Sequence, residues 1–176
     1  MALYIKAIPF AIRSKQYIII RFVVISFVLY FLWLLCYDKV AEFINPWLTM
    51  LTAKGSSGLV NMLGFKAYLK GTTLNVSNFD VVFIDTPCNG LILFAQFAVF
   101  IIAFPGPVGK KFWYIPMGIL VIYFLNLIRI AALALISIYD YKSLNFDHHF
   151  LFNIIAYSVI FTMWFFWFNK LSFRQN

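Results

Sequence analysis

The sequence is poor in charged residues, which make up 11% of its 176 positions, whereas hydrophobic residues make up 64%. Soluble domains contain about 25% charged residues and roughly 45–50% apolar residues. The composition therefore excludes an ordinary soluble domain and indicates an integral membrane protein. The length is that of one domain, so residues 1–176 are interpreted as a single integral membrane domain.

Cysteine and histidine are also scarce, with two residues of each. Cys36 and Cys88 cannot supply a zinc cluster or a disulfide framework. His148 and His149 are adjacent, so they point in different directions on a helix, and no carboxylate-rich set accompanies them at metal-ligand spacing. Neither a metal nor a cofactor is expected. For Cys36, a buried thiol that behaves as a small hydrophobe is favoured over a disulfide with Cys88.

Long apolar runs, in contrast, are abundant. A helix needs about 20 mainly apolar residues to cross a bilayer. The first run reaches that length and no small-residue cleavage site follows it, so we interpret it as a retained span rather than a signal peptide. The runs predict an all-α fold, a polytopic membrane helical bundle of about four transmembrane helices, at residues 17–37, 88–104, 112–138 and 151–168.

The few acidic residues have an uneven distribution that predicts the topology. With a cytoplasmic N-terminus, the inner segments hold eight Lys and Arg and no acidic residue, while the outer segments hold all six acidic residues. This asymmetry follows the positive-inside rule. We therefore expect a multi-pass protein of the cytoplasmic (inner) membrane with both termini cytoplasmic. The net charge of +8 then reflects topology and membrane lipid, and no nucleic-acid partner is expected.

The longest outer segment is the loop at residues 38–87. Apolar residues at helical spacing over 40–51 predict an amphipathic helix at the outer leaflet. "GSSG" at 55–58 is expected to break it, and the apolar run from 59 to 69 predicts a second such helix. Val-, Thr- and Phe-rich runs between 72 and 85 predict a small β-hairpin in this first outer loop.

Arg129 is the most conspicuous polar residue, because it lies inside a predicted span. It follows Phe112 by 17 residues, or about 25 Å of helix, which places it near the outer edge of a hydrocarbon core about 30 Å thick. Asn126 lies on the same helix face. A snorkelling arginine near a helix end is the alternative interpretation. Charged residues within spans usually face the protein interior and carry function.

Two further chemically active groups are predicted at the same level. Cys88 begins the second span on the outer side, and the histidine pair precedes the fourth span on that side. A thiolate is an effective nucleophile and is favoured near a cation or a helix start. A histidine can move protons to and from the reacting groups, and a guanidinium can stabilise an oxyanion. Cys88, Arg129 and a histidine therefore form a coherent candidate site.

The choice between the histidines depends on the helix face. His149 shares its face with Asn153 and Tyr157, whereas His148 shares its face with Phe152 and Ile155. A polar stripe favours the bundle interior, so His149 is the favoured catalytic residue and His148 the alternative.

Three short motifs resemble the exosortase/archaeosortase family of polytopic membrane cysteine transpeptidases. They are "PCNGL" with Cys88 and Gly90, "NLIRI" with Asn126 and Arg129, and "DHHFLFN" before the last span. Two positions depart from the usual pattern. Asn89 stands where the family usually has Ser, and Asn153 stands where many members have Gly four residues after the histidine.

The resemblance implies a function and a site. Members cleave C-terminal sorting signals of exported proteins, which would be the partners of this chain. Cys88 would carry an acyl thioester at the extracytoplasmic face, Arg129 would act as proton donor or oxyanion partner, and His149 or His148 would assist. The alternative function is a non-catalytic membrane assembly or transport-accessory protein with a structural Arg/His cluster.

Overall fold

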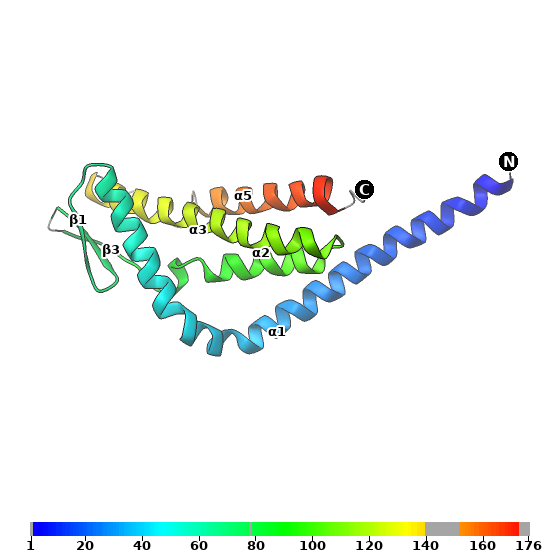
Figure 1. Ribbon diagram of the computed structural model, residues 1–176, viewed down its shortest axis with the longest axis horizontal. Coiled ribbons are helices and arrows are strands. Elements are labelled where there is room, and N and C mark those ends of the chain that lie inside the picture. Colours follow the sequence, from blue (N-terminus) through cyan, green and yellow to red (C-terminus); the bar gives the residue numbers. More distant parts are fainter. Residues whose placement is uncertain (1, 78, 140–151, 173–176) are drawn as a thin grey trace.

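The computed structural model describes residues 2–77, 79–139 and 152–172. Its helices are α1 (Ala2–Met62), α2 (Leu91–Ala103), α3 (Val108–Tyr139) and α5 (Phe152–Phe166). A 3₁₀ turn, η1 (Thr86–Cys88), precedes α2, and a π-helical turn (Trp167–Ser172) follows α5. In Figure 1, α2, α3 and α5 run side by side, and the first half of α1 extends away from them. The predicted helical membrane fold is confirmed.

The apolar helices of the described residues correspond to the about four predicted spans, but one of them is short. Within the residues that the structure describes, three helical stretches are long and apolar enough to cross a membrane: Gln16–Met62, Val108–Ile138 and Phe152–Ser172. The second predicted span, at residues 88–104, instead consists of η1 and the 13-residue helix α2. At about 1.5 Å per residue, α2 is shorter than a hydrocarbon core of about 30 Å. It therefore does not cross such a core as a helix by itself.

Helix α1 continues through the segment in which the sequence predicted an outer loop. The amphipathic helix expected over 40–51 is present, but as part of the same 61-residue helix. The predicted break at "GSSG" is wrong. Ser56 and Ser57 are buried, and a Cβ at Gly55 would lie 2.9 Å from the side chain of Leu127 in α3. These small residues therefore allow α1 and α3 to pack closely, instead of ending the helix.

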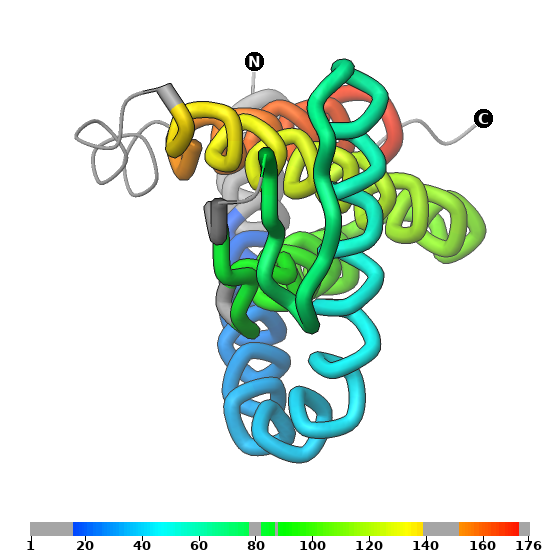
Figure 2. The backbone as a smooth tube through the Cα atoms, turned by 90° about the vertical axis from the view of Figure 1, so that its left-hand side faces the viewer, coloured from blue at the N-terminus to red at the C-terminus, as the bar shows by residue number. Residues whose placement is uncertain are grey.

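Pro46 lies within α1, and Figure 1 shows that this helix bends between its two halves. Proline has no backbone N–H, and its ring clashes with the carbonyl four residues earlier, here that of Glu42. A proline is therefore a sufficient physical cause for a bend in a long helix. The second half of α1 then runs across the end of the bundle, beside the β-sheet (Figures 1 and 2).

The sheet has three antiparallel strands in the order β1 (Ala67–Lys70), β2 (Thr73–Val76) and β3 (Phe79–Phe83). The sequence predicted the β2–β3 hairpin but assigned residues 67–69 to a helix. That helix ends earlier because Gly64 adopts a φ of +91°, and Asn61 then holds both the N–H and the carbonyl of Ala67 at 2.9 Å. The chain is thereby redirected into β1. Figure 2 shows the strands beside the second half of α1.

The core has two parts. The first joins α2, α3 and α5 around the fully buried Phe97 and Trp167, and Tyr114 in α3 donates a hydrogen bond of 2.8 Å to the carbonyl of Met163 in α5. The second lies between α1, the sheet and the later part of α3; its buried residues are Ala53, Val60, Leu74, Val76, Ile84, Ile130, Ala131 and Ala134. The segment that carries Cys88 lies where these two parts meet.

Candidate functional site

Cys88 lies in a rigid turn between β3 and α2. The side chain of Asp85 caps η1 by accepting a hydrogen bond of 2.7 Å from the N–H of Thr86. The N–H of Cys88 donates to the carbonyl of Asp85 at 2.9 Å. The sequence predicted that Cys88 begins the second span itself. It lies instead in the separate turn before α2, because the backbone turns between them.

Gly90 makes that change of direction possible. Its φ of +87° is in the left-handed region, which glycine adopts without the steric cost that a Cβ imposes. A Cβ at this position would also lie 3.3 Å from the ring of Phe94 and 3.5 Å from Nδ2 of Asn126. The backbone conformation therefore favours glycine at this position of the "CNG" motif, and the ring of Phe94 leaves little room for a Cβ.

Asn126 connects α3 to the Cys88 turn. It is buried, and its Nδ2 donates a hydrogen bond of 2.7 Å to the carbonyl oxygen of Cys88. These two residues are 38 positions apart in the chain. Arg129 follows Asn126 by three residues in α3, on the same helix face. The structure therefore brings together Cys88, Gly90 and Asn126, with Arg129 one turn farther along α3.

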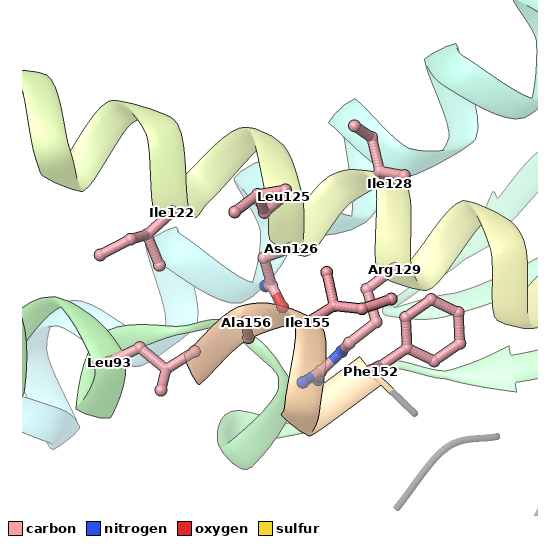
Figure 3. Close-up of a pocket in the computed structure, with 9 residues that line it drawn as sticks. All are labelled: Leu93, Ile122, Leu125, Asn126, Ile128, Arg129, Phe152, Ile155 and Ala156. Atoms are coloured by element: carbon pink, nitrogen blue, oxygen red, sulfur yellow. The ribbon is translucent and has the colours of Figure 1, made fainter. Parts of the chain in front are cut away.

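Arg129 and Asn126 line a small cavity between α2, α3 and α5, of about 90 Å³. Figure 3 shows both side chains extending from α3 toward α5. The other lining residues are apolar: Leu93, Ile122, Leu125, Ile128, Phe152, Ile155 and Ala156. The Nε atom of Arg129 is buried and has no hydrogen-bond partner among the described residues. A guanidinium whose Nε is unpaired among the described residues, in an otherwise apolar cavity, is suited to an anionic or carbonyl oxygen of a ligand.

The side chain of Cys88 does not line this cavity. It is half-buried and packs against the second part of the core, between α1, the sheet and α3. Asn126 is the link, since it lines the cavity and also holds the backbone of Cys88. Cys88 and Cys36 are both free thiols, so the disulfide alternative is excluded in this structure. The expectation of a buried Cys36 is wrong, because this residue is exposed on α1.

The two histidine candidates, His148 and His149, lie outside the described residues, and α5 begins after them. Asn153 and Tyr157, which share the face of His149, are exposed. Phe152 and Ile155 line the Arg129 cavity instead. Tyr157 lines a separate open groove beside α1 and α2, together with Ser26 and Gln96. The face that points into the cavity is the one that His148 would continue at helical spacing.

Sequence reasoning missed three residues near the nucleophile candidate. Asn89 is buried and hydrogen-bonded to Asn45 and Thr49 of α1. The available signal was the pair of polar residues spaced four apart in an otherwise apolar stretch of helix. The sequence alone did not show that these two residues bind Asn89, the residue after Cys88.

Together, the long apolar helices and this arrangement define a helical membrane protein with a polar site between its helices. A family model described as transmembrane exosortase (Exosortase_EpsH) matches residues 15–166. The chain therefore belongs to the transmembrane exosortase family, which confirms the resemblance noted in the sequence. No curated protein and no solved structure matches the chain.

Proposed function

We propose that this chain is a membrane-embedded cysteine transpeptidase or peptidase that cleaves C-terminal sorting signals of exported proteins. Membership of the transmembrane exosortase family indicates a membrane-embedded role in processing such signals. The observation that best supports the finer proposal is the hydrogen bond from Asn126 to Cys88. It ties the cysteine turn to the helix face that carries Arg129.

The proposed reaction has two steps. The thiolate of Cys88 attacks the scissile carbonyl carbon, a C–S bond forms, and the C–N bond breaks as the leaving amine takes a proton. An acceptor amine or water then attacks the thioester, the C–S bond breaks, and the thiol is restored. Arg129 would stabilise the oxyanion in both steps. One of the two histidines would transfer the protons, with His148 favoured by the face of α5 that lines the cavity.

A groove beside the cysteine turn supports a role for residues 38–87 in substrate recognition. The groove is open, measures about 500 Å³, and lies between α1 and the segment that leads into η1. All of its lining residues fall within that predicted loop, among them Asn45, Thr49, Phe83 and Asp85. An extended peptide placed in this groove would approach Cys88 from the side of α1.

The proposed topology places this site at the extracytoplasmic face, with both termini in the cytoplasm. A membrane-impermeant maleimide added to intact spheroplasts is then expected to label Cys36 and Cys88, because the first lies at the outer end of the first predicted span and the second at the outer start of the second. Labelling is read by mass spectrometry, and maleimide added to inverted membrane vesicles is the control. Modification of Cys88 in inverted vesicles alone would contradict the topology.

The decisive test of the chemistry is to trap the covalent intermediate. Membranes quenched in acid are expected to contain a fraction of the chain whose Cys88 peptide carries an acyl group, because thioesters survive at low pH. Neutral hydroxylamine should release that group, and mass spectrometry should identify the acyl protein. The matched control is Cys36, which should carry none. A chain that never carries an acyl group on Cys88 while processing proceeds would exclude this mechanism.

A further inference from the structure

Asn89 is the residue of the "PCNGL" motif that departs from the usual family pattern, and it is almost completely buried. Its side chain is 1% exposed, although it lies in a turn between a strand and a helix. Buried polar side chains are costly unless their hydrogen bonds are made. The positions of its amide partners therefore indicate what the residue does.

The amide of Asn89 is fully paired. Its Nδ2 donates to Oδ1 of Asn45 at 2.7 Å and to Oγ1 of Thr49 at 3.2 Å. Its Oδ1 accepts from the N–H of Leu91, in the first turn of α2, at 3.0 Å. A backbone N–H can only donate, so the atom facing Leu91 must be the oxygen and the amide orientation follows. One side chain thus connects the start of α2 to α1.

The partners on α1 are matched to this asparagine. Asn45 and Thr49 are spaced four residues apart, so they lie on one helix face, and they are 8% and 6% exposed. A serine at position 89 could still accept from the N–H of Leu91, but its shorter side chain lacks the second donor group. The bonds to α1 therefore depend on asparagine at this position.

We propose that Asn89, Asn45 and Thr49 form a clamp that positions Cys88 by fixing its turn to α1. On the opposite side, Asn126 of α3 holds the carbonyl of Cys88. Two helices therefore hold the turn. Helix α3 binds the backbone of Cys88 itself, and α1 binds the side chain of the next residue, Asn89. The three clamp residues are positioning residues, and their effect on catalysis rests on the proposed function.

The first test measures the reactivity of Cys88 in the purified full-length chain carrying Cys36→Ala, with N-ethylmaleimide as the probe. Because the thiol is half-buried, loosening the turn should expose it. Asn89→Ser and Thr49→Val are each expected to raise the alkylation rate, by about fivefold for each hydrogen bond lost. The double variant should react no faster than Asn89→Ser, since that change already removes the bond to Thr49.

The matched control is Thr52→Val, one turn farther along α1. Thr52 is buried, as Thr49 is, but its hydroxyl has no hydrogen-bond partner in the part of the chain that the structure describes. Its alkylation rate should stay within about twofold of the parent, because no paired hydroxyl is lost. Unchanged alkylation in Asn89→Ser, or rates that multiply in the double variant, would overturn the clamp.

The second test separates positioning from a purely structural role. Asn89→Ser is expected to lower processing per folded molecule while it raises the alkylation rate, and the thermal midpoint in detergent reports the folded fraction. Faster alkylation with unchanged processing would overturn the positioning role. The alkylation assay does not depend on peptide cleavage. If substrates are still processed in a chain without Cys88, the proposed enzyme function fails, and that result is distinct from a failure of the clamp.

Discussion

Cells that carry Cys88→Ala in place of the parent chain are expected to lose processing of exported substrates by at least about 1,000-fold. Alanine cannot form the thioester on which the proposed reaction depends. Cys88→Ser should be nearly as inactive, because a hydroxyl is a much weaker nucleophile unless it is strongly activated. The measurement compares full-length and cleaved forms of envelope proteins by mass spectrometry, at matched amounts of the membrane chain.

Cys36→Ala is the internal control for this result. Cys36 is exposed on α1 and forms no disulfide, so its loss should leave processing within about twofold, as is usual for exposed positions away from special features. Processing that survives in Cys88→Ala would exclude the enzyme and favour the non-catalytic assembly or transport-accessory alternative. Equal losses of processing in Cys88→Ala and Cys36→Ala would show that both thiols support the fold.

Arg129→Met is expected to separate activity from stability. Activity should fall about 100- to 1,000-fold, the usual effect of removing an oxyanion donor. Stability should stay equal or rise, because the variant removes a buried donor that has no partner among the described residues and leaves an unbranched side chain in an apolar cavity. Processing rates and thermal midpoints in detergent provide the two measurements.

Two further variants sharpen this prediction. Arg129→Lys retains the charge but not the planar fork of donors, so it should recover little of the activity if geometry matters. Lys54→Met removes an exposed charge of α1 and should change neither the processing rate nor the thermal midpoint. A strong loss of stability in Arg129→Met, with normal processing per folded molecule, would instead support the snorkelling interpretation of this arginine.

The elements that sequence reasoning predicted well are those set by local periodicity. Helix α3 was expected as one long helix, and it is. Asn126 and Arg129 were expected on one face, and both line the same cavity. A spacing of three residues determines a shared face whatever surrounds the helix. For α5 the same logic predicted a polar face toward the bundle, and Tyr157 of that face lines an open groove beside α1 and α2 rather than the Arg129 cavity.

The β1 strand and the uninterrupted α1 were missed for a related reason. Small residues such as those of "GSSG" favour a turn when they face solvent, but here Gly55 lies against Leu127 of α3 and the serines are buried. Helix propensity is a weak preference that tertiary packing overrides. Whether such a segment continues or breaks therefore depends on a helix that lies about 70 residues away.

The sequence by itself determined that this is a helical membrane protein and that its polar groups are few, and it predicted that a cysteine, an arginine and an asparagine belong to one site. Composition and helical periodicity are local properties, and they suffice for those conclusions. Only the tertiary structure decided which way the Cys88 side chain points and what Asn89 binds. Its partners Asn45 and Thr49 lie 44 and 40 residues away. Hydrogen bonds over such separations depend on how the helices pack, which no local pattern records.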